Sequence, residues 1–146
     1  MADKPSVLFL CTGNSCRSQM AEGWSHYLLA NQLTAYSAGI ETHGLNDRAV
    51  RVMSEAGVDI SQQESQLVET FANLHPDLVV TVCDDAAEVC PTFPGATHMV
   101  HHSFADPAQA TGSEAEILAA FRKVRDEIKT FVATLPDILD RISKQS

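Results

Sequence analysis

Short apolar segments alternate along this chain with longer segments in which apolar residues recur every three or four positions. Four segments have the character of strands, at positions 7–10, 33–38, 78–82 and 97–101. The segment at 78–82, Leu-Val-Val-Thr-Val, is the clearest, because β-branched residues dominate it and a proline precedes it by two positions. Strands that read as continuous apolar runs are typical of sheets that are covered on both faces.

Three helices are predicted between and after these strands. The first runs from 18 to about 31, with Ser18 as its N-terminal cap. Its apolar face carries Met20, Trp24, Tyr27 and Leu28. We expect the two aromatic side chains of this helix to lie in the core rather than to serve as a stacking surface.

The second helix begins at Asn46 or Asp47 and ends before Gly57, which is a typical C-terminal stop. The third follows Ser113-Glu114-Ala115-Glu116, which has the pattern of a capping box. It is long and amphipathic, and its apolar face extends to Leu135. This helix can therefore cover one face of a sheet.

Strands that alternate with helices indicate an α/β fold, with a four-stranded parallel sheet flanked by helices on both faces. No repeat or linker divides the chain, so we expect a single domain over 1–146. Ligands of such sheets bind at the carboxyl ends of the strands. Cys11 and Cys83 each stand at such an end.

Charge and cysteine content narrow the class of partner. The chain has 19 acidic and 10 basic residues, a net charge of -9, which argues against nucleic acid or an anionic membrane as partner. The N-terminus is not a signal peptide, and the apolar run at 7–10 is too short to span a membrane. We therefore expect a cytoplasmic protein whose four cysteines are catalytic, metal-binding or buried rather than joined in structural disulfides.

The segment after the first strand, Cys11-Thr12-Gly13-Asn14-Ser15-Cys16-Arg17, consists of a cysteine, five residues and an arginine. Small loop residues let successive backbone N–H groups point at one tetrahedral oxyanion, and the following helix adds its partial positive charge. Arg17 can hold two oxygens of such an anion. The same surroundings stabilise a thiolate at Cys11, to which Ser18 can donate a hydrogen bond. Residues 12–18 are therefore candidate oxyanion-binding residues around a Cys11 nucleophile.

Simpler interpretations of this segment exist. It is not a nucleotide-binding P-loop, because no Gly-Lys-Ser/Thr follows at the required spacing. A buried cysteine at a strand end beside a surface arginine would produce the same pattern. Cys16 itself can simply pack behind the loop.

Five segments together resemble the low-molecular-weight protein tyrosine phosphatase fold. They are CTGNSCRSQMAEGW at 11–24, SAGIETHGLN at 37–46, AGVDIS at 56–61, VCDDAAEVCP at 82–91 and FADP at 104–107. The chain is more closely similar to the arsenate reductases that are built on this fold and recycled by thioredoxin. The resemblance implies reduction of arsenate to arsenite in arsenic detoxification, thioredoxin as partner, a monomer, and no tightly bound cofactor.

Asp106 matches the general acid of this family. A carboxylic acid beside an anion site could protonate a leaving oxygen. Asp-Pro is also a common way to begin a turn, so Asp106-Pro107 could be purely structural.

Reduction of arsenate needs two electrons, which two thiols supply when they form a disulfide. The resemblance assigns this task to Cys83 and Cys90. Cys83 attacks the Cys11 sulfur of the adduct, and Cys90 then attacks Cys83, which leaves a Cys83–Cys90 disulfide. From their spacing alone, two buried cysteines are an equal alternative, whereas a zinc site is disfavoured by the six intervening residues.

The segment 84–89 is expected to be helical. Seven residues of helix span about 10.5 Å, whereas the Cα atoms of a disulfide lie roughly 4.4–6.8 Å apart. This segment would therefore have to unwind when Cys83 and Cys90 join.

Two features of the family are only partly present. Some members bind potassium, and Asn14, Glu22 and Ser37 match their ligands, but Gln66 replaces an aspartate, which weakens a site for a hard cation. The family often has Trp-Gly before its Asp-Pro, where this chain has His102-Ser103. His98, His101 and His102 lie close together, but we expect them to be structural or surface residues rather than metal ligands.

Two other functions remain open from the sequence. A small tyrosine phosphatase would use Cys11, Arg17 and Asp106, although Ala-Gln-Ala follows Asp106-Pro107 where such enzymes carry tyrosines. An oxyanion-binding redox sensor would form a disulfide without turnover. Phosphatase activity could also accompany arsenate reduction as a weak side reaction.

Overall fold

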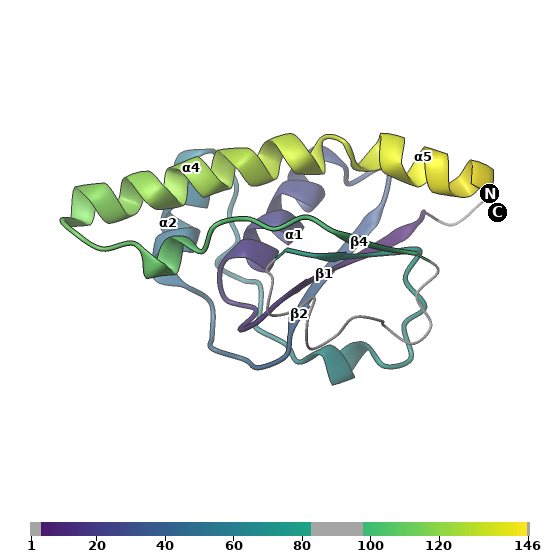
Figure 1. Cartoon of the computed structure of the whole chain (residues 1–146), viewed down its shortest axis with the longest axis horizontal. Helices are drawn as coiled ribbons and strands as arrows, with labels where there is room; N and C mark the ends of the chain where they lie inside the picture. The colour runs from purple at the N-terminus through teal and green to yellow at the C-terminus, as the bar shows by residue number, and fades with distance from the viewer. Residues whose placement is uncertain (1–3, 83–97, 146) are drawn as a thin grey trace.

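The computed structural model describes residues 4–82 and 98–145 of the chain. Four parallel strands form one sheet in the order β2-β1-β3-β4, as Figure 1 shows. They are β1 (Ser6–Cys11), β2 (Thr34–Gly39), β3 (Leu78–Thr81) and β4 (Met99–His101). The predicted parallel α/β fold is confirmed, and each predicted strand is present to within two residues at the ends that the structure describes.

The core lies between this sheet and the helices packed above it in Figure 1. The side chains of Val7, Leu8 and Phe9 on β1 are completely buried, as are those of Leu78, Val79 and Val80 on β3. Helix α1 (Arg17–Leu28) contacts both β2 and helix α4 (Glu114–Val132). Burial of β1 on both faces fixes its carboxyl end, and with it the position of Cys11.

Helix α1 differs from the prediction at both ends. It begins at Arg17 with Cys16 as N-cap, and no side chain caps it. Ser18 therefore lies inside the first turn, where it is buried and accepts a hydrogen bond from Asn14 Nδ2 at 2.9 Å. The prediction of Ser18 as cap was wrong because the loop at 12–16 leads directly into the helix, so that Cys16, its last residue, stands at the N-cap.

The two aromatic residues of α1 have different environments. Trp24 is 2% exposed, and its indole N–H donates to the carbonyl of Arg125 on α4. Tyr27 is 58% exposed and touches the Trp24 ring only edge to face. The expectation of a core position is confirmed for Trp24 and wrong for Tyr27, which lies at the edge of the apolar stripe.

Helix α2 (Asp47–Glu55) agrees with its sequence signals. The Asn46 side chain accepts hydrogen bonds from the backbone N–H groups of Arg48 and Ala49. Gly57 has a positive φ of 88°, and the bonds from Gly57 N to Ser54 O and from Val58 N to Met53 O end the helix. Glycine is required there because a side chain would strain this backbone.

The C-terminal region contains two helices rather than one. The predicted capping box between Ser113 and Glu116 is present at the start of α4. However, α4 ends at Val132, and α5 (Leu135–Gln145) follows. Pro136 explains the break, because proline has no N–H to continue α4 but fits the first turn of a new helix.

Two short 3-10 helices complete the described chain, η1 (Val68–Phe71) and η2 (Pro107–Gln109). None of the helices in the described ranges is long and apolar enough to cross a membrane. Cys83, Cys90 and the helix predicted at 84–89 lie outside the described residues.

Candidate active site

The segment between β1 and α1 forms a cup at the carboxyl edge of the sheet. We call Cys11 to Arg17 the oxyanion cup. Cys11 is the last residue of β1, and Arg17 is the first residue of α1. Both cysteines of the cup, Cys11 and Cys16, are buried. The nucleophile and the arginine predicted from the sequence therefore lie at the two ends of one tight loop.

The carbonyl groups of the cup are bonded on its outer side. Those of Thr12, Gly13 and Ser15 accept from the backbone N–H groups of Glu41, His43 and Asn46, at 2.9, 3.0 and 2.9 Å. The Asn14 carbonyl accepts from Gln19 Nε2 at 3.0 Å, and the Cys16 carbonyl from Met20 N at 2.9 Å. In a planar trans peptide, N–H and C=O point in opposite directions. The N–H groups of residues 13–17 therefore face away from these partners, in the arrangement that binds anions.

Asn14 provides the turn within the cup. Among the non-glycine residues that the structure describes, only Asn14 has a positive φ, 48°. Asparagine tolerates this left-handed conformation better than most residues. Alternation of right- and left-handed residues is what brings successive N–H groups to one side in an anion-binding nest.

A network of side-chain amides supports Asn14 from behind. Its Oδ1 accepts from the backbone N–H of Gln66 at 2.7 Å and from Gln19 Nε2 at 3.1 Å. Gln63 Nε2 donates to Gln19 Oε1 at 2.8 Å, and Ser65 Oγ donates to the Gly13 carbonyl. Because these buried and half-buried polar groups are hydrogen-bonded, they restrict the conformation of the cup around Asn14 before an anion arrives.

The Arg17 side chain is held by the segment at 104–106. Its Nη1 donates to the Phe104 carbonyl at 3.1 Å, and its Nη2 lies 3.5 Å from Asp106 Oδ2. Its Nε is buried, and among the described atoms it has no hydrogen-bond partner. An unsatisfied buried donor is unfavourable, and an oxyanion in the cup would supply the missing acceptor.

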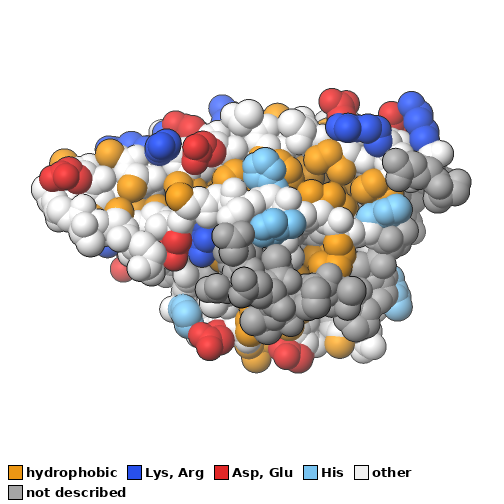
Figure 2. All heavy atoms as spheres, in the orientation of Figure 1, with side chains coloured by type: hydrophobic (Ala, Val, Ile, Leu, Met, Phe, Trp, Pro, Cys, Tyr) orange, Lys and Arg blue, Asp and Glu red, His pale blue; other side chains and the backbone are white. Residues whose placement is uncertain are grey.

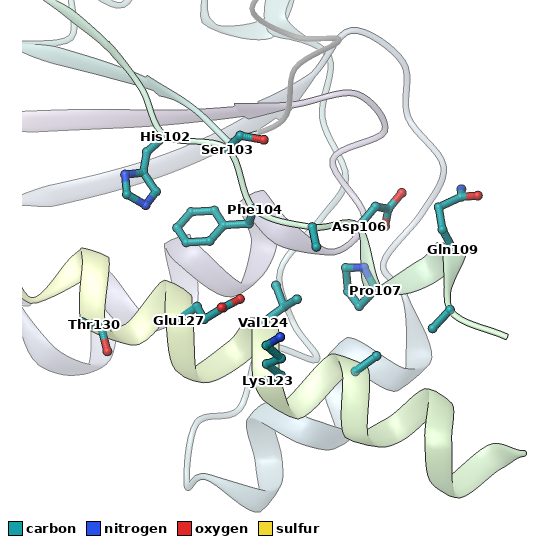
Figure 3. Close-up of a pocket in the computed structure, with 13 residues that line it drawn as sticks. His102, Ser103, Phe104, Asp106, Pro107, Gln109, Lys123, Val124, Glu127 and Thr130 are labelled. Atoms are coloured by element: carbon teal, nitrogen blue, oxygen red, sulfur yellow. The ribbon is translucent and has the colours of Figure 1, made fainter. Parts of the chain in front are cut away.

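Asp106 both begins a turn and faces the cup. Its Oδ1 accepts from Ala108 N at 3.0 Å, which caps η2, while its Oδ2 faces Arg17. Figure 3 shows Pro107 directed toward α4 and the Asp106 carboxylate directed away from it. The turn reading and the catalytic reading of Asp106-Pro107 are therefore compatible.

Cys16 differs chemically from a nucleophile. Burial raises the pKa of its thiol to about 12, and the nearby Asp106 carboxylate acts in the same direction, against the opposing effect of Arg17. At neutral pH this thiol stays protonated. This state agrees with the expected packing role of Cys16 behind the loop.

The predicted potassium ligands do not form a complete cage. Ser37 Oγ donates to Glu22 Oε1 at 2.6 Å, so these two residues lie together. Burial raises the pKa of Glu22, which a cation would oppose. However, both the side-chain and the backbone oxygen of Asn14 already accept N–H donors, and Gln66 presents an N–H at this place. These residues do not fit a potassium ion well, and no step below depends on one.

Two of the three neighbouring histidines make local contacts within the described residues. His101 Nδ1 lies 2.7 Å from Thr81 Oγ1, and the His102 ring stacks on Phe131 with centroids 4.4 Å apart. Within 4–82 and 98–145, no three His, Cys, Asp or Glu side chains come together as metal ligands. His102 thus places an aromatic ring against Phe131 at the position where the family often has the tryptophan of Trp-Gly.

Two hollows along α4 are separate from the cup. One, of about 760 Å³, lies between residues 102–110 and α4 (Figure 3). The other, of about 590 Å³, is lined by Val100, Phe131 and Ile138 among others, where Figure 2 shows apolar side chains below α4 and α5. Neither is lined by Cys11 or Arg17.

The residues that support the cup were not predicted. Glu41, His43 and Ser65 are distant in sequence from the cup, and only the pairing of β1 with β2 brings the first two onto it. Gly39 could have indicated a close approach of this segment to the cup, because a Cβ at this position would lie 2.7 Å from Asn14 N. Cys83 and Cys90 lie outside the described residues, so their roles stay predictions.

Proteins that are similar to this chain in sequence include arsenate reductases. An arsenate reductase of Halalkalibacterium halodurans is 52% identical over 136 residues, covering 90% of this chain and 98% of that protein. An arsenate reductase of Bacillus subtilis is 53% identical over 122 residues, covering 84% and 88%.

Solved structures show the same fold. An arsenate reductase in the phosphate binding state superposes with a TM-score of 0.78 at 32% identity, covering 97% of this chain and 99% of its own. A thioredoxin-dependent arsenate reductase of Corynebacterium glutamicum has a TM-score of 0.72 at 23% identity, over 95% of this chain and 63% of its own. The family model for low molecular weight phosphotyrosine protein phosphatase matches residues 6–145. This chain therefore belongs to the low molecular weight phosphotyrosine protein phosphatase family.

Proposed function

We propose that this protein reduces arsenate to arsenite, with Cys11 as nucleophile, as part of arsenic detoxification. The observation that carries the proposal is the oxyanion cup. Next to a cysteine it combines five outward-bonded carbonyls with a buried Arg17 Nε that has no acceptor among the residues that the structure describes. The two relatives above, about half identical to this chain and named arsenate reductases, support the choice of arsenate.

The first step joins arsenic to sulfur. Cup N–H groups and Arg17 hold the arsenate oxygens, and the Cys11 thiolate attacks arsenic to form an S–As bond. One As–O bond breaks, and protonated Asp106 gives its proton to the leaving oxygen, which departs as water. Arg17 contacts both the cup and Asp106, so it aligns the acid with the anion.

The second step transfers two electrons. The Cys83 thiolate attacks the Cys11 sulfur, an S–S bond forms, and the electron pair of the S–As bond stays on arsenic, which leaves as arsenite. Cys90 then attacks Cys83, releases the Cys11 thiolate and leaves a Cys83–Cys90 disulfide. This order follows the family resemblance, and the chemistry balances without a bound cofactor.

Regeneration needs a dithiol that reduces Cys83–Cys90. We propose thioredoxin, because the Corynebacterium glutamicum protein of the same fold is named as thioredoxin-dependent. A monomer that works in the cytoplasm, without nucleic acid or membrane as partner, completes the proposal. The net charge of -9 agrees with the absence of polyanionic partners.

A coupled assay tests the function. Arsenate is supplied with thioredoxin, thioredoxin reductase and NADPH, and arsenite is measured. We expect steady turnover in the wild type and in Cys16→Ser, a single turnover in Cys90→Ser, and none in Cys11→Ser. Turnover that survives Cys83→Ser would refute the relay.

Phosphatase activity is a second candidate, because Cys11, Arg17 and Asp106 are the groups that hydrolysis of a phosphate ester needs. The family model that matches this chain is named for such phosphatases. Hydrolysis of a phosphotyrosine analogue without arsenite formation would make it the main activity. We expect instead a weak side activity that Cys83→Ser leaves unchanged.

A further inference from the structure

Two neighbouring residues hold the oxyanion cup with both backbone and side chain. The backbone N–H groups of Glu41 and His43 donate to the carbonyls of Thr12 and Gly13. Their side chains pair with each other, with His43 Nε2 2.7 Å from Glu41 Oε2. The side-chain pair therefore sits directly on the two peptides that begin the cup.

The His43 ring fills the space beside Gly13. A Cβ built on Gly13 would lie 2.3 Å from His43 Nδ1 and 2.8 Å from its Cγ, far closer than atoms can approach. The ring thus packs against the Gly13 backbone in the place of a side chain. No residue other than glycine fits at position 13 while His43 keeps this position.

Glycine in the cup creates a difficulty that this contact resolves. Glycine has the largest conformational freedom of any residue, so a free Gly13 would have to be ordered each time an anion binds. Binding groups that are fixed in advance avoid this loss and bind more tightly. The Gly13 carbonyl is already held by His43 N and Ser65 Oγ. Packing by the imidazole, which pairs with Glu41 although both side chains are more than half exposed, restricts Gly13 further before the anion arrives.

We propose that His43, held by Glu41, is a positioning residue that fixes Gly13 of the oxyanion cup in its anion-binding conformation. The inference rests on the proposed function only in that the cup binds an oxyanion. His43 acts through Gly13 and its flanking peptides and takes no part in electron or proton transfer. Glu41 acts through His43.

The test uses inorganic phosphate as probe, because phosphate binding does not depend on arsenite formation. Phosphate in the cup protects Cys11 from alkylation by iodoacetamide, and the concentration that halves the alkylation rate reports its affinity. Mass spectrometry confirms that Cys11 is the residue modified. The variants are His43→Ala, His43→Gln and Glu41→Ala, with His75→Ala, an exposed histidine outside the cup, as control.

His43→Ala should raise the half-protecting phosphate concentration by roughly five- to thirtyfold, from the ~1–2 kcal/mol needed to fix one residue's backbone. His43→Gln should restore most of the affinity, because its amide can fill the space and donate to Glu41. His75→Ala should match the wild type. In arsenate reduction, the KM of His43→Ala should rise with little change in kcat, because an effect on binding alone changes KM.

A double-mutant cycle separates positioning from a general loss of stability. If Glu41 acts through His43, Glu41→Ala should weaken phosphate binding in the wild type and have no further effect in His43→Ala. Phosphate affinity of His43→Ala within twofold of the wild type would overturn the proposal, as would additive effects or a His43→Gln variant as weak as His43→Ala. A wild type that binds phosphate but makes no arsenite would refute the proposed function and leave this inference standing.

Discussion

Replacement of Arg17 by lysine tests the geometry of the cup rather than its charge. The guanidinium donates through Nη1 to the Phe104 carbonyl, lies 3.5 Å from Asp106 through Nη2, and keeps a buried Nε without a partner among the described atoms. Lysine keeps one positive charge, but it has no planar fork and cannot serve all three positions.

The expected loss follows from the hydrogen bonds that lysine cannot make. A hydrogen bond to a charged group contributes about 1.5–3 kcal/mol, which corresponds to roughly 10- to 150-fold in affinity. Arg17→Lys should therefore weaken phosphate protection of Cys11 by at least about tenfold. Its effect on arsenate reduction should be larger than on phosphate binding, since Arg17 also aligns Asp106.

The assay compares the half-protecting phosphate concentration with the single-turnover rate of arsenite formation. Cys16→Ser serves as control, because it changes the cup without removing a donor to the anion. Thermal unfolding of Arg17→Lys is measured in parallel and should show some loss of stability, because lysine cannot keep both the bond to the Phe104 carbonyl and the contact with Asp106. Phosphate binding within threefold of the wild type would show that Arg17 supplies only charge, contrary to the geometry described above.

Three further predictions follow from other residues. Asn14→Ala and Asn14→Gly should both weaken the protection of Cys11 by phosphate. Asn14→Ala should be less stable to urea than Asn14→Gly by about 1 kcal/mol, because alanine is strained at φ 48°; equal stabilities of the two variants would contradict this. Burial raises the pKa of Glu22 above its unfolded value of 4.5, so the free energy of unfolding should fall as pH rises from 4.5 through the higher pKa of the folded state. Glu22→Gln should flatten this pH dependence in thermal unfolding, and an unchanged pH profile would contradict the prediction. Phe121→Ala should lower the unfolding free energy by roughly 3–5 kcal/mol in urea, because the side chain is completely buried in the core; a loss below 1 kcal/mol would mean that the core repacks.

Local sequence patterns predicted those parts of the fold that depend on neighbouring residues. The Asn46 cap, the Gly57 stop and the capping box at Ser113 each act within one helical turn, and all three are present. The break before α5 could also have been predicted, because Pro136 cannot continue a helix. Ser18 was assigned as a cap because serine usually has that role, but the N-cap of α1 is Cys16, two residues earlier.

The candidate site was predictable only where its residues are contiguous. Cys11 to Arg17 form a single loop, so their spacing was enough to predict an anion-binding cup. Three backbone N–H groups bond the outer side of this loop, those of Glu41, His43 and Gln66. They reach it through strand pairing and long-range packing. No local pattern encodes such contacts. His43 lies in the segment at 37–46 that resembles the family, but nothing in its residue type or spacing indicated a contact with Gly13.

In the proposed mechanism, the oxyanion cup starts a two-electron relay through Cys83 and Cys90. The most direct measurement mixes fully reduced protein with arsenate in the absence of any other reductant, then counts arsenite and maps disulfides by mass spectrometry. We expect about one arsenite per protein molecule, because two thiols supply two electrons, together with a Cys83–Cys90 disulfide and a Cys11 that can still be alkylated. Absence of arsenite, or a disulfide that joins Cys11 to Cys16 instead, would contradict it.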